Sequence, residues 1–467
     1  MNAKNDLIMT ELKQLIEQQK VFFNTGKTRD LSFIKSTLIQ LKKSILKNEK
    51  AIFEALHKDF KKSKFEAYFS EIGILISEID MTLKNLNVWT RPEKVRAAAL
   101  NFPSRDYIYS EPYGQVLVIA PWNYPFQLAI APAISAIAAG NTVVLKPSEL
   151  TSHTAQIIED ILSEIFDKAH LCVVQGGIPE TTALLNERWD YIFFTGSVPV
   201  GKIVAKAAAQ YMTPVTLELG GKNPCIIDDS VDLKLTAKRL VWGKFVNAGQ
   251  TCIAPDYLIV EHSIKAKLID HLKTEIIKAY GEDSKTSTDY PRIVNTRNLE
   301  RLSEMLQGVN VVHGGQIDAE DNYLAPTLVD NPDLNSTLME GEIFGPILPI
   351  LSYSTKEDIE SIVNRYEKPL GFYVFSNRMK FYKALIKKYS FGGGAVNDTM
   401  IHFGNPRLPF GGVGESGIGA YHGRLGFDTF SHKKGITIKA NWLDIPLRYA
   451  PYTNKLKKIK KAFKWLG

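Results

Sequence analysis

The chain is poor in cysteine, with three among its 467 residues. Three cysteines cannot supply the disulfide framework on which small secreted domains depend. Cys172 and Cys225 lie in apolar runs typical of strands, and we expect both to be buried free thiols. This cysteine usage fits a reducing compartment and favours a cytoplasmic protein.

Long uncharged apolar runs are also missing. No stretch reaches the roughly 18 residues that a membrane-spanning helix needs. Residues 1–20 are polar and of mixed charge, without the apolar segment of a secretory signal. Hydrophobic residues make up 45% of the sequence and charged residues 23%, as in ordinary soluble globular proteins. At this length two or more domains are expected.

Excess positive charge is confined to the C-terminal end. The formal net charge is +7, but six lysines with no acid among them follow Tyr452, and without these six the charge falls to +1. A nearly neutral remainder argues against a nucleic-acid-binding surface. Among these lysines, apolar residues recur at helical spacing: Leu456, Ile459, Phe463 and Leu466. We favour a solvated face for this run, and the alternative is an interfacial helix in peripheral contact with anionic lipid.

Helical and strand patterns alternate along the chain. Residues 31–60 carry apolar residues at helical spacing, which predicts a helix. Five short, apolar, β-branched runs then predict strands at 116–119, 142–145, 171–174, 191–194 and 215–219. Further strands are predicted after Gly220-Gly221, at 225–227, 258–260, 372–375 and 395–397. Because helical segments separate most of these strands, we predict two α/β domains with parallel sheets, joined near 218–222.

The usual nucleotide-binding fingerprints are absent. Neither Gly-x-Gly-x-x-Gly nor a Walker A loop occurs at a predicted strand end. Instead, the strand ending at Phe194 runs into Thr195-Gly196-Ser197-Val198-Pro199-Val200-Gly201-Lys202. A strand, a Gly-containing turn and a helix start would present free backbone N–H groups to a pyrophosphate.

Polar residues follow two other predicted strands. Asn123 lies just past the strand at 116–119, where parallel sheets place ligands, and its amide could donate to a developing oxyanion. An ordinary turn asparagine is the alternative. Lys146 and Glu149 follow the strand at 142–145 and could bind ribose hydroxyls, or form only a surface ion pair.

Two residues are candidates for the chemistry itself. Glu218 lies in an apolar strand, where a buried carboxylate has a raised pKa and can act as a general base; otherwise backbone groups of the inter-domain link satisfy it. Cys252 ends Asn247-Ala248-Gly249-Gln250-Thr251-Cys252, a Gly-containing turn on which a small molecule could reach the thiol. Glu342-Ile343-Phe344-Gly345-Pro346 and Pro409-Phe410-Gly411-Gly412 could wall a planar ligand, or be ordinary turns.

Seven short motifs occur in a fixed order: Pro121-Trp122-Asn123, Lys146-Pro147-Ser148-Glu149, Phe194-Thr195-Gly196-Ser197, Glu218-Leu219-Gly220-Gly221-Lys222, Gly249-Gln250-Thr251-Cys252, Glu342-Ile343-Phe344-Gly345-Pro346 and Pro409-Phe410-Gly411-Gly412. Together they resemble the motif set of the aldehyde dehydrogenase superfamily over residues 110–435. The runs Ala420-Tyr421-His422-Gly423 and Phe427-Asp428-Thr429-Phe430-Ser431-His432 resemble its class 3 branch, which handles fatty and aromatic aldehydes.

The resemblance implies a role for each matching residue. Cys252 would be the nucleophile, Asn123 and the Cys252 backbone N–H would hold the oxyanion, and Glu218 would activate water. The implied cofactor contacts are Lys146 and Glu149 to the adenosine ribose, Thr195, Gly196, Ser197 and Gly201 to the pyrophosphate, and Glu342 and Phe344 to the nicotinamide ribose. No metal is implied. Because Glu149 should repel a 2′-phosphate, NAD is favoured, with NADP also open to the class 3 branch.

The resemblance also implies the domain organisation. A Rossmann-like NAD(P)-binding domain would span 1–217, with part of a small β oligomerisation flap near 88–112. An α/β catalytic domain would span 218–405, residues 406–445 would return to the cofactor domain and the flap, and 446–467 would form the basic tail. A homodimer is typical of the class 3 branch.

The implied activity is NAD(P)-dependent oxidation of a medium- or long-chain aliphatic or aromatic aldehyde to the carboxylate. An acyl-CoA-forming or reductive member of the same fold is an alternative, although Glu218 speaks against thioester release by CoA. A cysteine hydrolase is disfavoured because no histidine lies in the motifs beside Cys252. A non-catalytic binding or structural relative is the remaining alternative.

Overall fold

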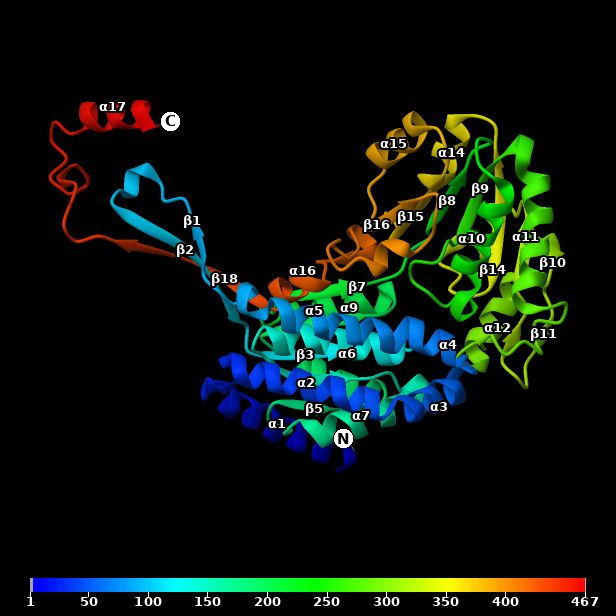
Figure 1. Cartoon of the computed structure of the whole chain (residues 1–467), viewed down its shortest axis with the longest axis horizontal. Helices are drawn as coiled ribbons and strands as arrows, with labels where there is room; N and C mark the ends of the chain where they lie inside the picture. The colour runs from blue at the N-terminus through cyan, green and yellow to red at the C-terminus, as the bar shows by residue number, and fades with distance from the viewer. Residues whose placement is uncertain (1–2, 467) are drawn as a thin grey trace.

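The computed structural model describes residues 3–466, with side chains over 10–464. Three parts of the sequence predictions lie outside the described residues. They are residues 1 and 2 of the expected 1–217 domain, Gly467 of the basic tail, and the side chain of Leu466 in the apolar stripe of that tail. The chain forms two bodies that each contain a parallel sheet, and a slender arm that projects from the first body (Figure 1).

The predicted helix at 31–60 is wrong in one respect, because it is two helices. α2 (Leu31–Lys47) and α3 (Glu49–Phe60) are separated at Asn48, whose backbone leaves the helical region with φ −97° and ψ 10°. The Asn48 side chain donates to the Ser44 carbonyl at 2.9 Å. A short amide side chain competes in this way with the helical backbone, and the apolar spacing alone does not reveal it.

The first body contains a six-stranded sheet in the order β17-β7-β6-β3-β4-β5. Its strands are β3 (Gln115–Ile119), β4 (Thr142–Lys146), β5 (Leu171–Val173), β6 (Tyr191–Thr195), β7 (Val215–Glu218) and β17 (Gly417–Ile418). β3 to β7 are parallel, and β17 runs antiparallel to β7. All five predicted strands of this region are present, in the strand order of the doubly wound dinucleotide-binding sheet.

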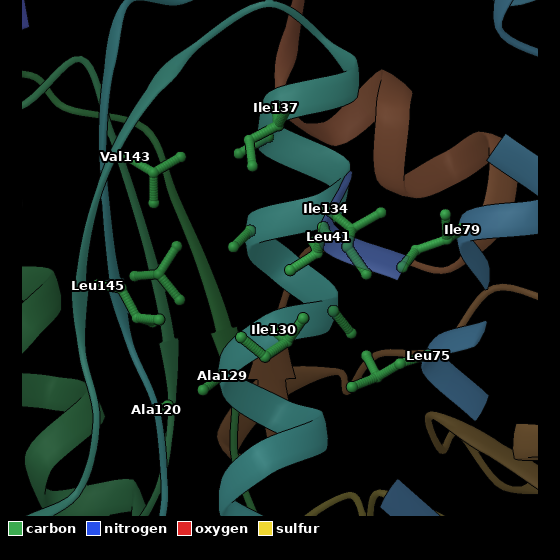
Figure 2. Close-up of a cluster of buried hydrophobic side chains, with 14 of the residues drawn as sticks. Leu41, Leu75, Ile79, Ala120, Ala129, Ile130, Ile134, Ile137, Val143 and Leu145 are labelled. Carbon is green, nitrogen blue, oxygen red and sulfur yellow. The ribbon is translucent and has the colours of Figure 1, made fainter. Parts of the chain in front are cut away.

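One helix at the centre of this body sets the position of the residues before it. α6 (Pro125–Ala138) is buried along its whole length and packs between the sheet and the N-terminal helices. Ile130 and Ile134 lie in the same apolar cluster as Val143 of β4 and Leu75 of α5 (Gly73–Trp89) (Figure 2). Because α6 starts immediately after Asn123 and Tyr124, this packing fixes that loop.

Helices cover both faces of the first sheet (Figure 1). They include α1 (Ala3–Asn24), α5 (Gly73–Trp89), α7 (Ser152–Ile165), α8 (Ile178–Asn186), α9 (Val198–Ala209) and α16 (Gly423–Thr429). Cys225 is buried as predicted. Cys172 is only partly buried, contrary to prediction, because its strand β5 is at the edge of the sheet.

The second body contains a seven-stranded sheet in the order β10-β13-β14-β9-β8-β15-β16, parallel except for β10. The four predicted strands are β8 (Pro224–Ile227), β9 (Tyr257–Glu261), β15 (Gly371–Phe375) and β16 (Gly393–Val396). The sequence pattern missed β10 (Val311–His313), β13 (Thr327–Asp330) and β14 (Ile347–Tyr353). Helices α10 (Leu233–Phe245), α11 (Lys265–Tyr280), α12 (Thr296–Met305), α14 (Lys356–Val363) and α15 (Met379–Lys388) flank it.

The arm is a three-stranded antiparallel sheet of β1 (Glu93–Val95), β2 (Ser104–Pro112) and β18 (Ser431–Lys439). α17 (Leu456–Leu466) lies beyond it, at the C-terminal end of the chain (Figure 1). The expected architecture of a Rossmann-like body, a second α/β body and a small β-sheet is therefore confirmed. Over residues 3–466, none of the helices has the length and apolar character needed to cross a bilayer.

Candidate active site

Cys252 lies on a strained turn between α10 and β9. Asn247 (φ 54°, ψ 29°) and Ala248 (φ 50°, ψ 36°) both adopt the left-handed conformation, which costs non-glycine residues free energy. Gly249 follows with φ 72°, and a Cβ there would lie 2.3 Å from the Gly345 carbonyl oxygen. The 247–252 turn is thus pressed against the loop that carries Glu342 and Phe344, and only glycine fits at 249.

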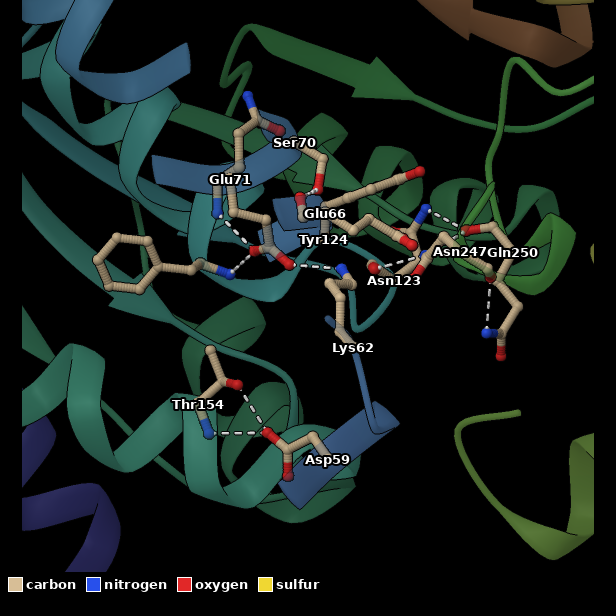
Figure 3. A network of polar contacts seen from close by, with 12 residues as sticks. Asp59, Lys62, Glu66, Ser70, Glu71, Asn123, Tyr124, Thr154, Asn247 and Gln250 are labelled. Carbon is tan, nitrogen blue, oxygen red and sulfur yellow. Dashed lines mark hydrogen bonds and ion pairs between the residues drawn. The ribbon is translucent and has the colours of Figure 1, made fainter. Parts of the chain in front are cut away.

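The loop that carries Asn123 is hydrogen-bonded to this turn (Figure 3). Buried Asn123 donates from Nδ2 to the Gln250 carbonyl at 3.0 Å. Asn247 donates from its own Nδ2 to the Asn123 carbonyl at 2.8 Å. The hydroxyls of Tyr124 and Thr251 share a 2.7 Å hydrogen bond. A primary amide has two N–H donors, so Asn123 can hold the turn and still donate to a ligand.

Two residues that the sequence did not single out hold the carbonyl groups around Cys252. Asn223 donates from Nδ2 to the carbonyls of Cys252 at 2.8 Å and Ala254 at 2.9 Å. The Tyr373 hydroxyl donates to the Ile253 carbonyl at 2.6 Å. Asn223 sits at the start of β8 beside the recognised Glu218-Leu219-Gly220-Gly221-Lys222 motif, which is the only signal that could have found it.

Glu218 is a buried carboxyl without a hydrogen bond. It ends β7, in register with Thr195 of β6 on one side and Gly417 of β17 on the other. It is 3% exposed, and neither carboxylate oxygen finds a hydrogen-bond partner among the described residues. Burial raises the pKa of Glu218 well above its ordinary value. An unpaired buried carboxyl is costly, and a substrate or water at this position would satisfy it.

The electrostatics of the site keep the Cys252 thiol protonated. Burial, followed by the negative charges of Glu342 and Glu218, raises the pKa of Cys252 far above its ordinary value. Burial and the charge of Asp256 raise the pKa of Glu342 to about 8. The charges of both glutamates thus act in the same direction as burial on the pKa of Cys252. These shifts also mean that the free site does not by itself generate the thiolate.

Glu342 rests on the bare backbone of Gly220. A Cβ at residue 220 would lie 2.0 Å from Glu342 Oε2, so any other side chain there would displace the Glu342 carboxylate. A buried ion pair between Lys222 and Asp256, with 2.7 Å between Nζ and Oδ2, holds the loop that carries Glu342. Asp256 Oδ1 also accepts the Ile343 N–H at 3.0 Å. Glu342 is thereby positioned from the same body that carries Cys252.

The motifs that contain Phe344 and Phe410 occupy different parts of the structure. Phe344 has a left-handed backbone (φ 50°) and meets Trp122 edge to face, with 5.2 Å between ring centroids. It therefore lies beside the Asn123 loop. Phe410 is instead buried in a cluster with Tyr421 and His422, so its contribution is to the packing that supports the site.

Lys146 and Glu149 are at the carboxyl end of β4. Lys146 is 2% exposed; its Nζ donates to the Pro147 carbonyl at 2.7 Å and lies 3.3 Å from Glu149 Oε2. The Glu149 side chain is 46% exposed. The pair is therefore half buried, and the outer side of the carboxylate is free to accept hydroxyl groups.

The segment after β6 places Thr195, Gly196 and Ser197 at the same edge of the sheet. Thr195 Oγ1 is buried and has no hydrogen-bond partner among the described residues. Ser197 precedes α9 without capping it through its side chain, so the first N–H groups of that helix remain free. Gly201 lies within α9, and a Cβ there would be 2.7 Å from Leu219 Cδ2. The Gly-containing turn predicted after Phe194 therefore ends before Val198, and Gly201, which the resemblance assigned to the pyrophosphate, lies inside α9 and packs against Leu219.

Exposed apolar side chains lie beside this segment. α8 starts with Ile178, which is 79% exposed, and the adjacent α9 exposes Val200 and Ile203. Sequence patterns did not single these residues out, because apolar residues near a helix start look like ordinary core positions.

Comparison with known proteins gives consistent results. Residues 10–436 match the sequence profile of the Aldehyde dehydrogenase family. The chain is 46% identical to a 4,4'-diaponeurosporen-aldehyde dehydrogenase of Staphylococcus aureus, over 98% of this chain and 100% of that one. It is 44% identical to the dimeric NADP-preferring aldehyde dehydrogenase of Rattus norvegicus, over 92% and 95% of the two chains. A substrate-bound structure of Staphylococcus aureus AldH matches with a TM-score of 0.95 at 46% identity, covering 97% and 99%.

Proposed function

Because this chain belongs to the aldehyde dehydrogenase family and oxidises aldehydes with NAD(P), we propose that Cys252 is its nucleophile. Its Sγ bonds to the aldehyde carbon, its proton passes to the Glu218 carboxylate, and the carbonyl oxygen becomes an oxyanion. The free N–H of the Asn123 amide and the Cys252 backbone N–H donate to that oxyanion. The support is the hydrogen bond that ties Asn123 to the cysteine turn.

The residues present fit a nicotinamide dinucleotide. Thr195 Oγ1 is buried without a partner among the described residues, and the Glu342 carboxylate packs against the Gly220 backbone, where its charge raises the pKa of Cys252. Lys146 and Glu149 would hold the adenosine ribose, and Glu342 with Phe344 the nicotinamide ribose. When bound, the cofactor accepts the hydride from the aldehyde carbon, which leaves a thioester on Cys252.

Ser197 with Thr195 and Gly196 would face the pyrophosphate at the start of α9. Ile178 and Val200 offer apolar surface for the adenine base. The charge of Glu149 favours the free ribose hydroxyls of NAD. We propose NAD as the preferred cofactor and NADP as a second one, the rat relative being NADP-preferring by name.

Glu218 completes the cycle. After it releases the thiol proton to solvent, its carboxylate takes a proton from a water that attacks the thioester carbon, and the carbon–sulfur bond breaks. Glu218 gives the proton that it took from water to the Cys252 thiolate, and the acid loses its own proton to solvent and leaves as the carboxylate. The observation that carries this role is that both Glu218 oxygens are buried and have no hydrogen-bond partner within the part of the chain that the structure describes; the charge of Glu218 also raises the pKa of Cys252.

The decisive experiment compares Cys252→Ala with Cys172→Ala, a cysteine outside the site. Cys252→Ala should abolish NADH production from aldehyde and NAD, whereas Cys172→Ala should retain it. An undiminished rate in Cys252→Ala would overturn the proposal. Adding CoA tests the acyl-CoA alternative, since our proposal expects the free acid as product with or without it.

We propose an apolar aldehyde, long-chain or aromatic, as the substrate. Phe65, Phe69 and Trp242 form an exposed aromatic cluster, with Phe65 stacked on Phe69 and Phe69 against Trp242. They flank Glu66 and the helix that leads into the cysteine turn. Phe69→Ala should raise KM for long-chain aldehydes and leave KM for acetaldehyde unchanged; equal effects on both would contradict this.

We also propose that the domains divide as the motifs indicate, at 1–217, 218–405 and 406–445. In support, β3 to β7 lie before residue 219, β8 to β16 lie between 224 and 396, and β17 and β18 return to the first body and the arm. Limited proteolysis should cut the exposed arm and linkers before either sheet.

A homodimer formed through the arm is proposed on the basis of its edge. β18 is an edge strand and exposes Ile436 and Ile438 on a sheet with little core of its own. Such an edge tends to be covered by another chain. The full chain should sediment as a dimer, and Ile436→Glu with Ile438→Glu should shift it to monomer. A monomeric wild type would refute the proposal.

The tail supports a second, peripheral contact. α17 exposes Leu456 and Phe463 beside its lysines, a combination that suits adsorption to anionic lipid. We propose a cytoplasmic enzyme, consistent with three free cysteines, that also adsorbs to the membrane surface. Co-sedimentation with phosphatidylserine vesicles should exceed that of a chain ending at Pro451; equal values would rule the contact out.

A further inference from the structure

The helix that follows Asn123 has no cap of its own. Tyr124 precedes α6 without a side-chain hydrogen bond to it, and Pro125 at its first position has no N–H. The first N–H groups of α6 are therefore those of Phe126 and Gln127. Both residues are buried, so these groups need an acceptor from another part of the chain.

Glu71 supplies that acceptor. Its Oε2 accepts the Phe126 N–H at 2.8 Å and the Gln127 N–H at 3.2 Å (Figure 3). Glu71 is 0% exposed and lies in η2 (Tyr68–Ile72), a π-helical turn that leads into α5. Turns of this kind are rare and occur frequently at functional sites. A carboxylate at a helix start is also favoured by the positive end of the helix dipole.

The other oxygen of this carboxylate binds a lysine. Lys62 Nζ is 2.7 Å from Glu71 Oε1, and both side chains are fully buried. Lys62 Nζ also lies 4.6 Å from the centroid of the Tyr124 ring, within the range of cation–π attraction. The hydroxyl of Tyr124 shares its 2.7 Å hydrogen bond with Thr251, the residue before Cys252. The ion pair thus holds this segment at two points, the Tyr124 ring and the start of α6.

We propose that Glu71 and Lys62 are positioning residues for Asn123. They fix the start of α6 and the Tyr124 ring, and so keep the Asn123 amide aimed at the carbonyl oxygen of a substrate bound to Cys252. The inference rests on the oxyanion role proposed for Asn123. An oxyanion donor works only at hydrogen-bond distance from the developing charge, and a misplacement of about 1 Å can cost about 100-fold in rate.

Paired substitutions test this without leaving a buried charge alone. Removing one partner of a buried ion pair is strongly destabilising, whereas apolar residues of similar volume in place of both are often tolerated. The leucine pair, Lys62→Met with Glu71→Leu, removes both charges and the acceptor for α6. The glutamine pair, Lys62→Met with Glu71→Gln, removes both charges but keeps an acceptor oxygen.

The rate of the first turnover is the primary measurement. With saturating aldehyde and NAD, rapid mixing should show the first NADH forming about tenfold more slowly in the leucine pair. The loss should be about threefold in the glutamine pair, because a neutral acceptor forms a weaker hydrogen bond than an ionised one. KM for NAD should not change in either pair, since neither side chain contacts the proposed cofactor residues.

The decisive comparison repeats both pairs in an Asn123→Ala background. A residue that acts through Asn123 has nothing left to position there, so neither pair should slow the first turnover further. A loss of general support would slow it in either background. Alkylation of Cys252 by iodoacetamide forms no oxyanion, so its rate should match that of wild type in both pairs.

The matched control is Glu78→Leu. Glu78 is also a buried carboxyl that contacts α6, but it does so at Ser135, away from the start of the helix, where Ser135 Oγ donates to it at 3.4 Å. Glu78→Leu should therefore leave the rate of the first turnover unchanged.

The outcomes separate cleanly. A graded loss that disappears in the Asn123→Ala background, with Glu78→Leu like wild type, supports the inference. If the leucine pair does not fold, the glutamine pair decides by the same comparison. A wild-type rate in the leucine pair, or in the glutamine pair where it stands alone, overturns the inference, as does a loss of equal size in the Asn123→Ala background. An active Cys252→Ala would overturn the proposed function instead, so the two failures are distinguishable.

Discussion

The side-chain amide of Asn123 donates a 3.0 Å hydrogen bond to the carbonyl oxygen of Gln250, two residues before Cys252. The contact joins segments that lie 127 positions apart in the sequence and belong to different sheets. One amide therefore has two tasks. Its first N–H fixes the turn, and its second can donate to the oxyanion in the role that we propose for Asn123.

Replacing this amide should lower both activity and stability. Asn123→Ala should reduce kcat about 100- to 1,000-fold, as loss of an oxyanion donor does. Asn141→Ala is a suitable control, because Asn141 is also buried and donates to two backbone carbonyls, at Ala136 and Phe430, away from the site. It should lower the thermal midpoint similarly while kcat stays within about twofold. Equal kcat losses in the two variants would show that Asn123 only supports the fold.

Glu218→Gln should separate hydride transfer from thioester hydrolysis. The amide keeps the volume of the side chain but cannot take a proton from water, so the thioester should accumulate. Rapid mixing should show a burst of about one NADH per active site that is slower than in the wild type, because the amide no longer accepts the thiol proton, followed by turnover slowed about 100-fold or more. Full steady-state turnover would exclude Glu218 as the base for hydrolysis.

Sequence patterns predicted the sheets well where strands are buried, apolar and short, as at β3, β4 and β6. They failed at β14, which contains Pro349 within the strand, because proline normally argues against a central strand. Motifs indicated Cys252, Glu218 and Glu342 as candidates for the site. They could not indicate Tyr373, because nothing in its neighbourhood tells that its hydroxyl reaches the Ile253 carbonyl, 120 positions away in the sequence.

The thiol of Cys252 should become more reactive when Glu342 loses its charge. Glu342 raises the Cys252 pKa, so Glu342→Gln should lower that pKa and speed alkylation by iodoacetamide at pH 9 in the absence of cofactor. Glu340→Gln, two residues away and exposed, should leave the rate unchanged. The rate should rise with pH in all three proteins, since the thiolate is the reacting form. An unchanged rate in Glu342→Gln would mean that the two groups do not interact.

Cofactor preference should depend on Glu149. Its half-exposed carboxylate would repel the 2′-phosphate of NADP. Glu149→Gln removes this repulsion and keeps the length of the side chain. The ratio of kcat/KM with NADP to kcat/KM with NAD should rise about two- to tenfold, the range expected of a partly screened charge. Added salt should raise this NADP-to-NAD ratio in the wild type and lower it in Glu149→Gln. A ratio that does not change on substitution would remove Glu149 from the ribose site.

Glu78 should make the fold less stable as the pH rises. Its pKa is raised from 4.5 to about 7 by burial, so between these values the folded state holds a proton that the unfolded chain has released. The folded state then binds more protons, and stability falls as pH increases through this window, by up to about 3 kcal/mol. Glu78→Gln removes the titration and can retain the contact with Ser135. Its thermal midpoint should match wild type near pH 4.5 and exceed it above pH 7. A constant difference across this range would mean that Glu78 is ionised in the folded protein, and that burial at this position leaves its pKa near the ordinary value.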